Sequence, residues 1–397
     1  MKLSALLPVL PLQAAALATQ TPLTRGEEPA PLLVPRGAQL VPNQYIVKLR
    51  GDRGSDFSVA EDVPSSVGVE PKHRYGKLIK GFSATLTADE LASLRDHPQV
   101  EFIEQDYVVS IAEYVSQHDA TWGLARVSSR KPHATEYEYD SSGGEGTCAF
   151  VVDTGVKAEI PEFEGRAKML KSFVDGEPED GHGHGTHVGG TIGSKTYGVA
   201  KKTKIYGIKV LDNLGSGPWS RVIAGLEFIA RYAGCKKKCP KGIVVNMSLT
   251  GGYSETVNTA SKALVDAGIF VGVAAGNYGY DVKDFSPASE PSVCTVAASD
   301  MDDAMPDWSN FGALVDVFAP GVDINSTQID GGTELGSGTS MASPHVVGLA
   351  AYLGALEGIS GGGVCDRIKE LATKDAITKV LSADTPNLLV FNGNPSG

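Results

Sequence analysis

The feature that most constrains the fold is a series of near-continuous apolar runs between residues 148 and 320. These runs are CAFVVD, KIYGIKVL, GIVVNMSL, GIFVGVAAGN, SVCTVAAS and LVDVFAP, and amphipathic segments such as SRVIAGLEFIARYA and ETVNTASKALVDAG lie between them. Strands that lack polar alternation are buried on both faces, which is typical of a parallel sheet covered by helices. The sequence therefore predicts an α/β domain whose functional side chains follow the carboxyl ends of its strands.

The N-terminal third of the chain has a different pattern. Residues 1–18 combine one lysine, a short apolar run and the small residues of ALA, which is typical of a secretory signal peptide. Residues 19–42 begin Pro-rich and unpatterned and are predicted to be a linker. Residues 43–114 show a compact α+β pattern, with strands in QYIVKL, LIKGFSATL and VEFIEQ. A helix is expected after Thr87, with Glu90 completing a capping box.

Composition limits the partners. The formal net charge of -12 argues against nucleic acid, because phosphate binding needs a basic surface. Beyond the signal peptide, the sequence has no apolar run that is long and uncharged enough to span a bilayer, so we expect no membrane partner. Export to an oxidising compartment predicts that the five cysteines form disulfides, with one cysteine left over.

Three polar residues stand at positions suited to chemistry. Asp153 closes the run CAFVVD, where a buried carboxylate is costly unless a group pairs with it. Asn277 closes GIFVGVAAGN, and its amide can donate to a developing negative charge. Ser340 follows the bare backbone of GSG and opens a long apolar helix, whose positive end supports an oxyanion. Each residue also has an ordinary structural alternative. Asp153 could cap a turn, Asn277 could form a turn and Ser340 could be a helix N-cap.

The stretch DGHGHGTHVGG contains three histidines, His182, His184 and His187. Their spacing also suits a zinc hydrolase, but such a site needs a further carboxylate and leaves the other polar residues unexplained. Acyl transfer needs a nucleophile, a base, an orienting carboxylate and an oxyanion donor. Ser340, one histidine, Asp153 and Asn277 supply these groups, in the chain order Asp, His, Ser that is known for subtilisin.

The motifs VVDTG, GHGHGTHVGG, VAAGN, SPASEPSVCTVAASD and SGTSMASPHVVGLAAYL resemble those of subtilisin-like serine peptidases, more narrowly fungal proteinase K-type enzymes. The resemblance runs from about Trp122 to the C-terminus and implies a three-layer subtilisin-like domain over residues 115–397. It identifies His184 as the base, with His187 a packing neighbour and His182 on the exposed approach loop. It implies a secreted, monomeric endopeptidase of broad specificity that acts through an acyl-enzyme. The other alternative, a catalytically silent secreted binding protein, is disfavoured because every reacting residue is present.

Residues 43–114 resemble the ferredoxin-like inhibitory propeptide of the same family, which implies a zymogen that processes itself. The hypothesis for the cleavage bond is Tyr114–Val115, because the tail IAEY offers an aromatic residue there and Ile111 to an apolar pocket walled by Trp219. The alternative for Trp219 is that it is a partly buried aromatic residue of the surface and does not wall this pocket. The resemblance assigns two backbone edges that clamp a substrate strand. They comprise Gly215, Ser216 and Gly217 on one side and Ser248, Leu249 and Thr250 on the other. Thr250 departs from the glycine of close relatives and could narrow the primary pocket.

The resemblance also implies a structural calcium ion and no organic cofactor. The calcium ligands would be the carboxylate of Asp316 and the carbonyls of Pro291 and Val293, and a salt bridge from Asp316 to a basic residue is the alternative. A second calcium site is doubtful, since Arg130 stands where a small polar residue is expected.

The implied disulfides are Cys148–Cys239 and Cys294–Cys365, with Cys235 left over; from the sequence, Cys148 could also pair with Cys235. Of the two glycosylation sequons, Asn325 in NST is expected to be exposed and modified. Asn246 in NMS falls in a buried strand and is expected to be unmodified.

Overall fold

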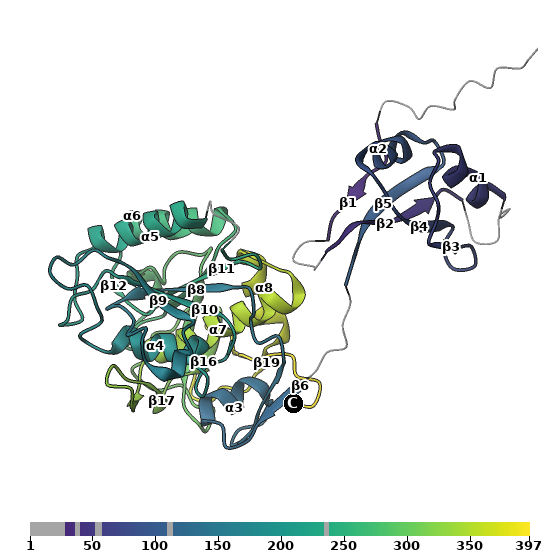
Figure 1. Cartoon of the computed structure of the whole chain (residues 1–397). Helices are drawn as coiled ribbons and strands as arrows, with labels where there is room; N and C mark the ends of the chain where they lie inside the picture. The colour runs from purple at the N-terminus through teal and green to yellow at the C-terminus, as the bar shows by residue number, and fades with distance from the viewer. Residues whose placement is uncertain (1–27, 36–39, 52–57, 109–113, 234–237) are drawn as a thin grey trace, which may run out of the picture. The chain divides into compact units, whose positions relative to one another are not determined.

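The computed structural model describes residues 28–35, 40–51, 58–108, 114–233 and 238–397. The predicted signal peptide, Ile111 and Cys235 lie outside these ranges. The chain forms two compact units, residues 1–109 and 110–397 (Figure 1). The predicted boundary at residue 114 thus falls a few residues inside the second unit.

The smaller unit is a five-stranded sheet with the order β1-β5-β2-β4-β3 and two helices. Its elements are β1 (Leu32–Leu33), β2 (Leu40–Leu49), α1 (Ser58–Ser66), β3 (His73–Tyr75), β4 (Gly81–Thr85), α2 (Ala88–Asp96) and β5 (Val100–Tyr107). The predicted capping box is present: the Thr87 hydroxyl accepts from the backbone N–H of Glu90, and the Glu90 carboxylate accepts from that of Thr87. Buried side chains including Val47, Phe82 and Ile103 form its core.

The linker predicted for residues 19–42 is wrong at its C-terminal end. Leu32–Leu33 pair parallel with Ile103 and Glu104 of β5, and β2 already begins at Leu40. Ala30 is fully buried, and its backbone N–H donates to the carbonyl of Arg95 at 2.7 Å. So short a strand has no periodic signal of its own, and its partner lies about 70 residues away in the sequence.

The larger unit is built on a nine-stranded sheet with the order β19-β20-β16-β15-β13-β11-β8-β10-β9. Its strands are β8 (Cys148–Asp153), β9 (Ala167–Ser172), β10 (Lys204–Lys209), β11 (Ile243–Met247), β13 (Phe270–Ala274), β15 (Cys294–Ser299), β16 (Val317–Pro320), β19 (Thr373–Lys374) and β20 (Leu388–Leu389). All of its pairings are parallel except β19–β20. The predicted parallel sheet is confirmed. The edge strand β9 was missed because its two lysines, Lys168 and Lys171, break the apolar pattern.

Helices cover both faces of this sheet, which gives the three layers seen in Figure 1. On one face lie α5 (Trp219–Ala233) and α6 (Glu255–Asp266), whose buried side chains join one hydrophobic cluster. On the other lie α3 (Trp122–Ser128), α4 (His184–Gly193), α7 (Thr339–Glu357) and α8 (Gly362–Leu371), which share a second cluster. No single described helix is both long and apolar enough to cross a membrane; α7 and α8 pass such a test only as a pair, which is bent by 98°.

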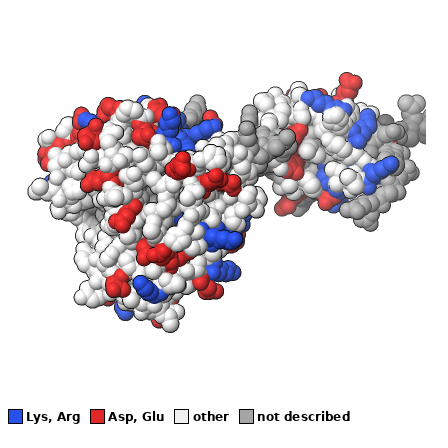
Figure 2. Space-filling model, turned by 90° about the horizontal axis from the view of Figure 1, so that it is seen from below, with Lys and Arg blue, Asp and Glu red and all other residues white. Residues whose placement is uncertain are grey.

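The remaining elements are short. They are β6 (Tyr114–Gln117) paired with β7 (Tyr137–Asp140), β12 (Gly251–Gly252) with β14 (Phe285–Ser286), β17 (Ile324–Thr327) with β18 (Thr333–Gly336), and two 3₁₀ turns, η1 (Pro161–Phe163) and η2 (Val282–Asp284). Figure 2 shows acidic and basic side chains interspersed over the face of each unit in view, so the negative charge is not gathered into one patch there.

The structure forms the two disulfides that the resemblance implies, Cys148–Cys239 and Cys294–Cys365. Asn246 is fully buried in β11, as expected. Asn325, however, is partly buried and so less exposed than expected. The reason is that its hairpin packs on α4, where the hydroxyls of Ser326 and Thr327 donate to helix carbonyls.

Candidate active site

The carboxyl end of β8 carries a buried carboxylate that is paired with an imidazole. Oδ1 of Asp153 accepts hydrogen bonds from Nδ1 of His184 at 2.7 Å and from the backbone N–H of Thr154 at 2.7 Å. His184 is the first residue of α4. Glycine at 185 permits this close approach, because a Cβ there would lie 2.0 Å from the carbonyl oxygen of Gly155 and 3.1 Å from Cβ of Asp153.

The Asp153 carboxylate sets the protonation of the imidazole. Burial lowers the pKa of His184, but the charge and the hydrogen bond of Asp153 outweigh burial, and the pKa of His184 ends above its ordinary value. Because an ionised carboxylate can only accept, the Nδ1 of His184 carries the proton. Nε2 is then the basic nitrogen, which is the arrangement that a general base requires.

The hydroxyl and the amide expected at the site face one pocket with this imidazole. Ser340 is the second residue of α7, and His184, Asn277 and Ser340 line the same pocket. The Oγ of Ser340 donates to the carbonyl oxygen of Ser248 at 3.2 Å. Backbone N–H groups in the first turn of a helix lack intrahelical partners, so the start of α7 presents partial positive charge to the pocket.

The amide of Asn277 has a fixed orientation. Its Oδ1 accepts from the backbone N–H and from the hydroxyl of Thr339, both at 2.8 Å. A backbone N–H can only donate, so the oxygen of the amide is bound there, and Nδ2 is left as a donor without a hydrogen-bond partner among the described residues. A Cβ on Gly338 would lie 3.2 Å from Nδ2, which places this donor beside the start of α7. Gly276, with φ of 105°, makes the turn that brings Asn277 out of β13.

The other two histidines lie where the resemblance implies. His187 is buried, and its Nε2 donates to the carbonyl oxygens of Ile324 at 3.0 Å and Glu334 at 3.1 Å. Burial lowers the pKa of His187, so it packs as a neutral residue. His182 is exposed on the loop before α4. Within the described ranges, the three histidines do not converge as metal ligands, which leaves the zinc alternative without support.

Sequence reasoning missed a carboxylate that shapes the loop before α4. Asp180 is buried, and its Oδ1 accepts from the backbone N–H groups of His182 at 3.1 Å and Gly183 at 2.9 Å. Its Oδ2 accepts from the N–H of Thr186 at 3.0 Å and from the Thr186 hydroxyl at 2.6 Å. Asp180 therefore holds the turn that positions His184. The available signal was an aspartate four residues before a helix start, a region where side-chain oxygens cap backbone N–H groups.

A buried lysine, also missed, supports the turn after Asp153. Lys209 is fully buried at the end of β10, in register with Asp153 of β8. Its Nζ donates to the carbonyl of Thr154 at 2.9 Å and to Oδ1 of Asn213 at 3.0 Å, and lies 3.3 Å from the carboxylate of Glu177. A lysine inside the apolar run KIYGIKVL was the signal, because a buried ammonium needs such acceptors.

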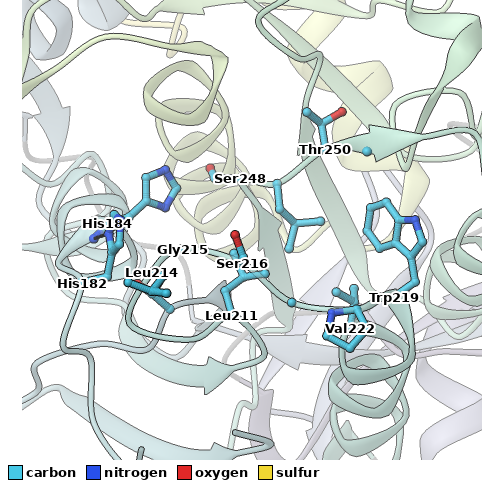
Figure 3. A pocket seen from close by; sticks show the side chains of 15 residues that line it. His182, His184, Leu211, Leu214, Gly215, Ser216, Trp219, Val222, Ser248 and Thr250 are labelled. Atoms are coloured by element: carbon cyan, nitrogen blue, oxygen red, sulfur yellow. Dashed lines mark hydrogen bonds between the residues drawn. The ribbon is translucent and has the colours of Figure 1, made fainter.

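The predicted substrate edges lie on opposite sides of one cleft next to His184 (Figure 3). The cleft is lined by all six edge residues, Gly215, Ser216, Gly217, Ser248, Leu249 and Thr250. Trp219 also lines it at the start of α5, and a Cβ on Gly251 would lie 2.6 Å from Cζ2 of the indole. The ring is half-buried and packs against the second edge, so it forms a wall of the cleft.

Thr250 stands against the segment that leads to Asn277. Its Oγ1 is buried and has no hydrogen-bond partner among the described residues. A Cβ on Gly276 would lie 3.4 Å from this oxygen. The branched side chain thus fills space beside Gly276 that a glycine at position 250 would leave open.

The residues implied as calcium ligands do not fit a calcium ion as they are arranged. Pro291, Val293 and Asp316 do line one pocket. However, Oδ1 of Asp316 lies 3.1 Å from Nζ of Lys369, and Oδ2 accepts from the backbone N–H of Thr295 at 2.9 Å. The structure therefore contains the salt bridge that the sequence left open as the alternative.

A carboxylate, an imidazole, a hydroxyl at a helix start and a side-chain amide meet at one cleft, beyond the carboxyl ends of a parallel sheet. Together the fold and these groups define a serine endopeptidase. Comparison with known proteins gives the family. The Subtilase family model matches residues 144–376, and the Peptidase inhibitor I9 model matches residues 44–112.

Individual relatives agree with this result. The chain is 49% identical over 394 residues to a cuticle-degrading protease of Metarhizium anisopliae, covering 99% of this chain and 100% of that protein. It is 47% identical over 393 residues to proteinase R of Parengyodontium album, with 99% of each chain covered. A crystal structure of a cold adapted subtilisin-like serine proteinase has a TM-score of 0.64 and 38% identity, and the match covers 69% of this chain and 98% of that one. The chain belongs to the subtilase family. Subtilases generally bind structural calcium, and no organic cofactor is expected.

Proposed function

We propose that Asp153, His184 and Ser340 form the catalytic triad of this endopeptidase and that Asn277 completes its oxyanion hole. The observation that carries the proposal is the 2.7 Å hydrogen bond from Nδ1 of His184 to buried Asp153, in a site where Ser340 and Asn277 face the same pocket as the imidazole. This is the set of roles that acyl transfer requires.

The chemistry is set by these positions. Nε2 of His184 takes the proton of the Ser340 hydroxyl as Oγ attacks the carbonyl carbon of the scissile peptide bond. Nδ2 of Asn277 and the backbone N–H of Ser340 donate to the oxyanion of the tetrahedral intermediate. His184 then gives its proton to the leaving amine, and water hydrolyses the acyl-enzyme by the reverse roles. Asp153 holds the imidazole in the required tautomer and stabilises the imidazolium.

One local rearrangement is part of this mechanism. The Ser340 hydroxyl donates to the carbonyl of Ser248, so rotation about its Cα–Cβ bond must exchange that partner for Nε2 of His184. Hydrogen bonds of the catalytic groups commonly tighten only when substrate is bound. Ser248 belongs to a proposed substrate edge, so the occupied cleft is where we expect this exchange.

We propose that substrates bind as an extended strand between the 215–217 and 248–250 edges. Main-chain hydrogen bonds supply affinity without reading side chains, which supports broad specificity. Trp219 would receive an apolar side chain upstream of the cleaved bond, and the bulk of Thr250 would narrow the primary pocket. Peptides and proteins are therefore the proposed substrates, with the chain's own propeptide as inhibitor and a monomer as the proposed state.

We further propose a secreted zymogen with a signal peptide over residues 1–18, a linker reduced to about residues 19–29, an inhibitory propeptide to residue 114 and a peptidase domain over residues 115–397. The I9 match, which ends at residue 112, supports this boundary. Tyr114 and Val115 lie in β6, and both side chains are partly exposed. Within the proposed secreted protein, Cys148 and Cys239 and likewise Cys294 and Cys365 are bonded, and partial exposure leaves Asn325 a candidate for glycosylation.

The proposal is tested by expressing the whole chain in a secreting fungal host and analysing the released protein. We expect Edman sequencing to start at Val115 and the protein to hydrolyse casein. Phenylmethylsulfonyl fluoride should abolish this activity, and a zinc chelator should leave the initial rate unchanged. A chelator-sensitive, fluoride-resistant activity would refute the serine mechanism, and a start far from Val115 would refute the proposed cleavage bond.

Replacing Asn277 by alanine should lower kcat by about 10²–10³-fold with little change in KM, because its amide acts on the charge of the transition state rather than on bound substrate. Steady-state kinetics on a peptide anilide measures both constants. The matched control is Asn325→Ala, which removes a partly buried amide from the β17 hairpin, outside the lining of the pocket that holds Asn277, and should keep kcat within about 2-fold. A drop in kcat of less than about 10-fold for Asn277→Ala would argue against the oxyanion role.

A further inference from the structure

In the pocket around Asp316, the cation next to the carboxylate is a side chain of the protein, the ammonium of Lys369. Asp316 directly precedes β16, and the pocket is completed by Pro291, Val293 and the side of α8 that carries Cys365 and Lys369. The family resemblance implies a calcium ion between the Asp316 carboxylate and the two carbonyls. Calcium takes 6–8 oxygen ligands at about 2.3–2.6 Å, so it needs a carboxylate that is free to coordinate it.

Both oxygens of this carboxylate already have partners. Oδ2 accepts from the backbone N–H of Thr295 at 2.9 Å, and the N–H of Asp316 donates back to the carbonyl of Thr295 at 2.9 Å. Oδ1 accepts from Nζ of Lys369 at 3.1 Å. The side chains of Asp316 and Lys369 are 18% and 34% exposed, so water screens the pair only in part. A divalent ion at this carboxylate would meet an ammonium at close range, and the two cations would repel each other.

The position of Lys369 suits a structural link. It follows Cys365 by one helical turn, and residues four apart share a face of a helix. Cys365 is bonded to Cys294, the first residue of β15, and Lys369 is paired with Asp316, which is next to β16. The strands β15 and β16 are neighbours in the sheet. One face of α8 is therefore tied to this pair of strands by a covalent bond and an ion pair side by side.

We propose that the Lys369 ammonium replaces the structural calcium of the family at this site. The lysine neutralises the partly buried carboxylate and joins α8 to the β15–β16 edge, which are the tasks that an ion bound to Asp316 would perform. Asp366, whose carboxylate lies 3.2 Å from Nζ, helps to hold the ammonium in place. The folded protein thus carries this cation at any calcium concentration.

The test measures thermal unfolding of the mature protein after inactivation with phenylmethylsulfonyl fluoride, which prevents self-digestion and makes the readout independent of activity. Calorimetric Tm values are compared in excess chelator and in millimolar calcium chloride. For the wild type we expect a difference below about 1 °C. For Lys369→Ala we expect a lower Tm in chelator and a gain of about 3 °C or more with calcium, because the freed carboxylate can now bind the ion.

Three further variants make the result specific. Lys369→Arg keeps the cation and should respond to calcium as little as the wild type. Lys369→Ala combined with Asp316→Asn should lose the calcium response that the single change creates. Lys262→Ala removes a lysine from an exposed ion pair with Asp266 on α6 and should neither lower Tm appreciably nor create a response. If Lys369→Ala folds poorly, Lys369→Gln serves in its place.

Two results would overturn the proposal. The first is a wild-type Tm that rises with calcium as much as the Tm of Lys369→Ala does, together with loss of this rise in Asp316→Asn. That result would show that Asp316 binds calcium even when Lys369 is present. The second is a Lys369→Ala protein that neither loses stability in chelator nor gains stability with calcium. Terbium luminescence of the same proteins reports binding directly and should appear only when Lys369 is removed and Asp316 is kept.

Discussion

Replacing Ser340 by alanine should reduce kcat for a peptide substrate by about 10⁶-fold, because no other group can form the acyl-enzyme. The α7 helix should remain intact, since alanine is a good helix former and the hydroxyl makes a single hydrogen bond, to the carbonyl of Ser248. Active-site titration with a serine-directed reagent and steady-state kinetics measure the loss. The unprocessed length of the variant, seen on a denaturing gel, tests self-processing in the same preparation.

Ser343 provides the matched control on the same helix. Its hydroxyl is buried and donates to Oδ1 of Asn246 at 2.9 Å, away from the proposed triad. Ser343→Ala should therefore keep kcat within a few fold while costing about 1–3 kcal/mol of unfolding free energy for the hydrogen bond removed. A Ser340→Ala protein that still cleaves itself, or that loses activity only as much as Ser343→Ala does, would contradict the nucleophile assignment.

Triad members act as a unit, so combining changes should add little. His184→Ala alone should cost about as much in kcat as Ser340→Ala, and the double variant should be no slower than either by more than about 10-fold. If the two residues contributed independently, the fold reductions in kcat of the single variants would instead multiply in the double variant. Non-additivity of this kind separates a shared proton transfer from two unrelated defects in folding.

The sequence predicted the sheet well because its signal is local and repeated. A parallel strand that is buried on both faces consists of a long run of apolar residues, and the Thr87 capping box is complete within four residues. The polar residues at the ends of these runs were found for the same reason: Asp153 and Asn277 interrupt a pattern that is otherwise apolar. A residue that comes directly after a strand in the sequence also lies at the carboxyl end of that strand in space.

The features that the sequence did not reveal depend on contacts between distant segments. Asp180 and Lys209 support the site through hydrogen bonds from the hydroxyl and to the carbonyl of Thr154, which lies 26 and 55 residues away in the sequence, and nothing within either segment indicates this partner. The same holds for the ion pair of Lys369, which depends on how α8 is turned toward β16. Motif resemblance identifies Asp316 as the position of the implied calcium ligand but carries no information about a lysine 53 residues away that pairs with its carboxylate.

Replacing Asp153 by asparagine should lower kcat by about 10⁴-fold while leaving the fold intact. The carboxylate can only accept, and it holds the proton of His184 on Nδ1. An asparagine amide can instead donate to Nδ1, which leaves the proton on Nε2 and removes the base that Ser340 needs. Oδ2 of Asp153 is buried and has no hydrogen-bond partner among the described residues, and an amide leaves that position unpaired while it removes the buried charge. The Tm should therefore change little.

The pH profile gives a second readout of the same change. Burial lowers the pKa of His184, and in the wild type the Asp153 charge raises that pKa above its ordinary value. In the asparagine variant both raising effects of Asp153 are lost and burial is opposed only by the smaller effect of the Asp180 charge, so the imidazole loses its proton at a lower pH. Since the neutral imidazole is the active form, kcat/KM rises with pH through this pKa, and the acid limb should move to lower pH. An acid limb that stays in place would contradict the assignment of His184 as the base held by Asp153.

Asp303 offers the contrasting control, because its buried charge has a structural partner. Its carboxylate accepts from Nε of Arg126 at 2.9 Å and from Nη2 at 3.0 Å, and neither residue lines the pocket that holds Ser340 and His184. Asp303→Asn leaves a buried guanidinium without its counterion and should cost about 3–5 kcal/mol of unfolding free energy. Its kcat at a temperature where it is folded should stay within a few fold of the wild type, with the acid limb unmoved. Opposite outcomes for two buried aspartates, one affecting rate and the other stability, would separate catalytic charge from structural charge in this enzyme.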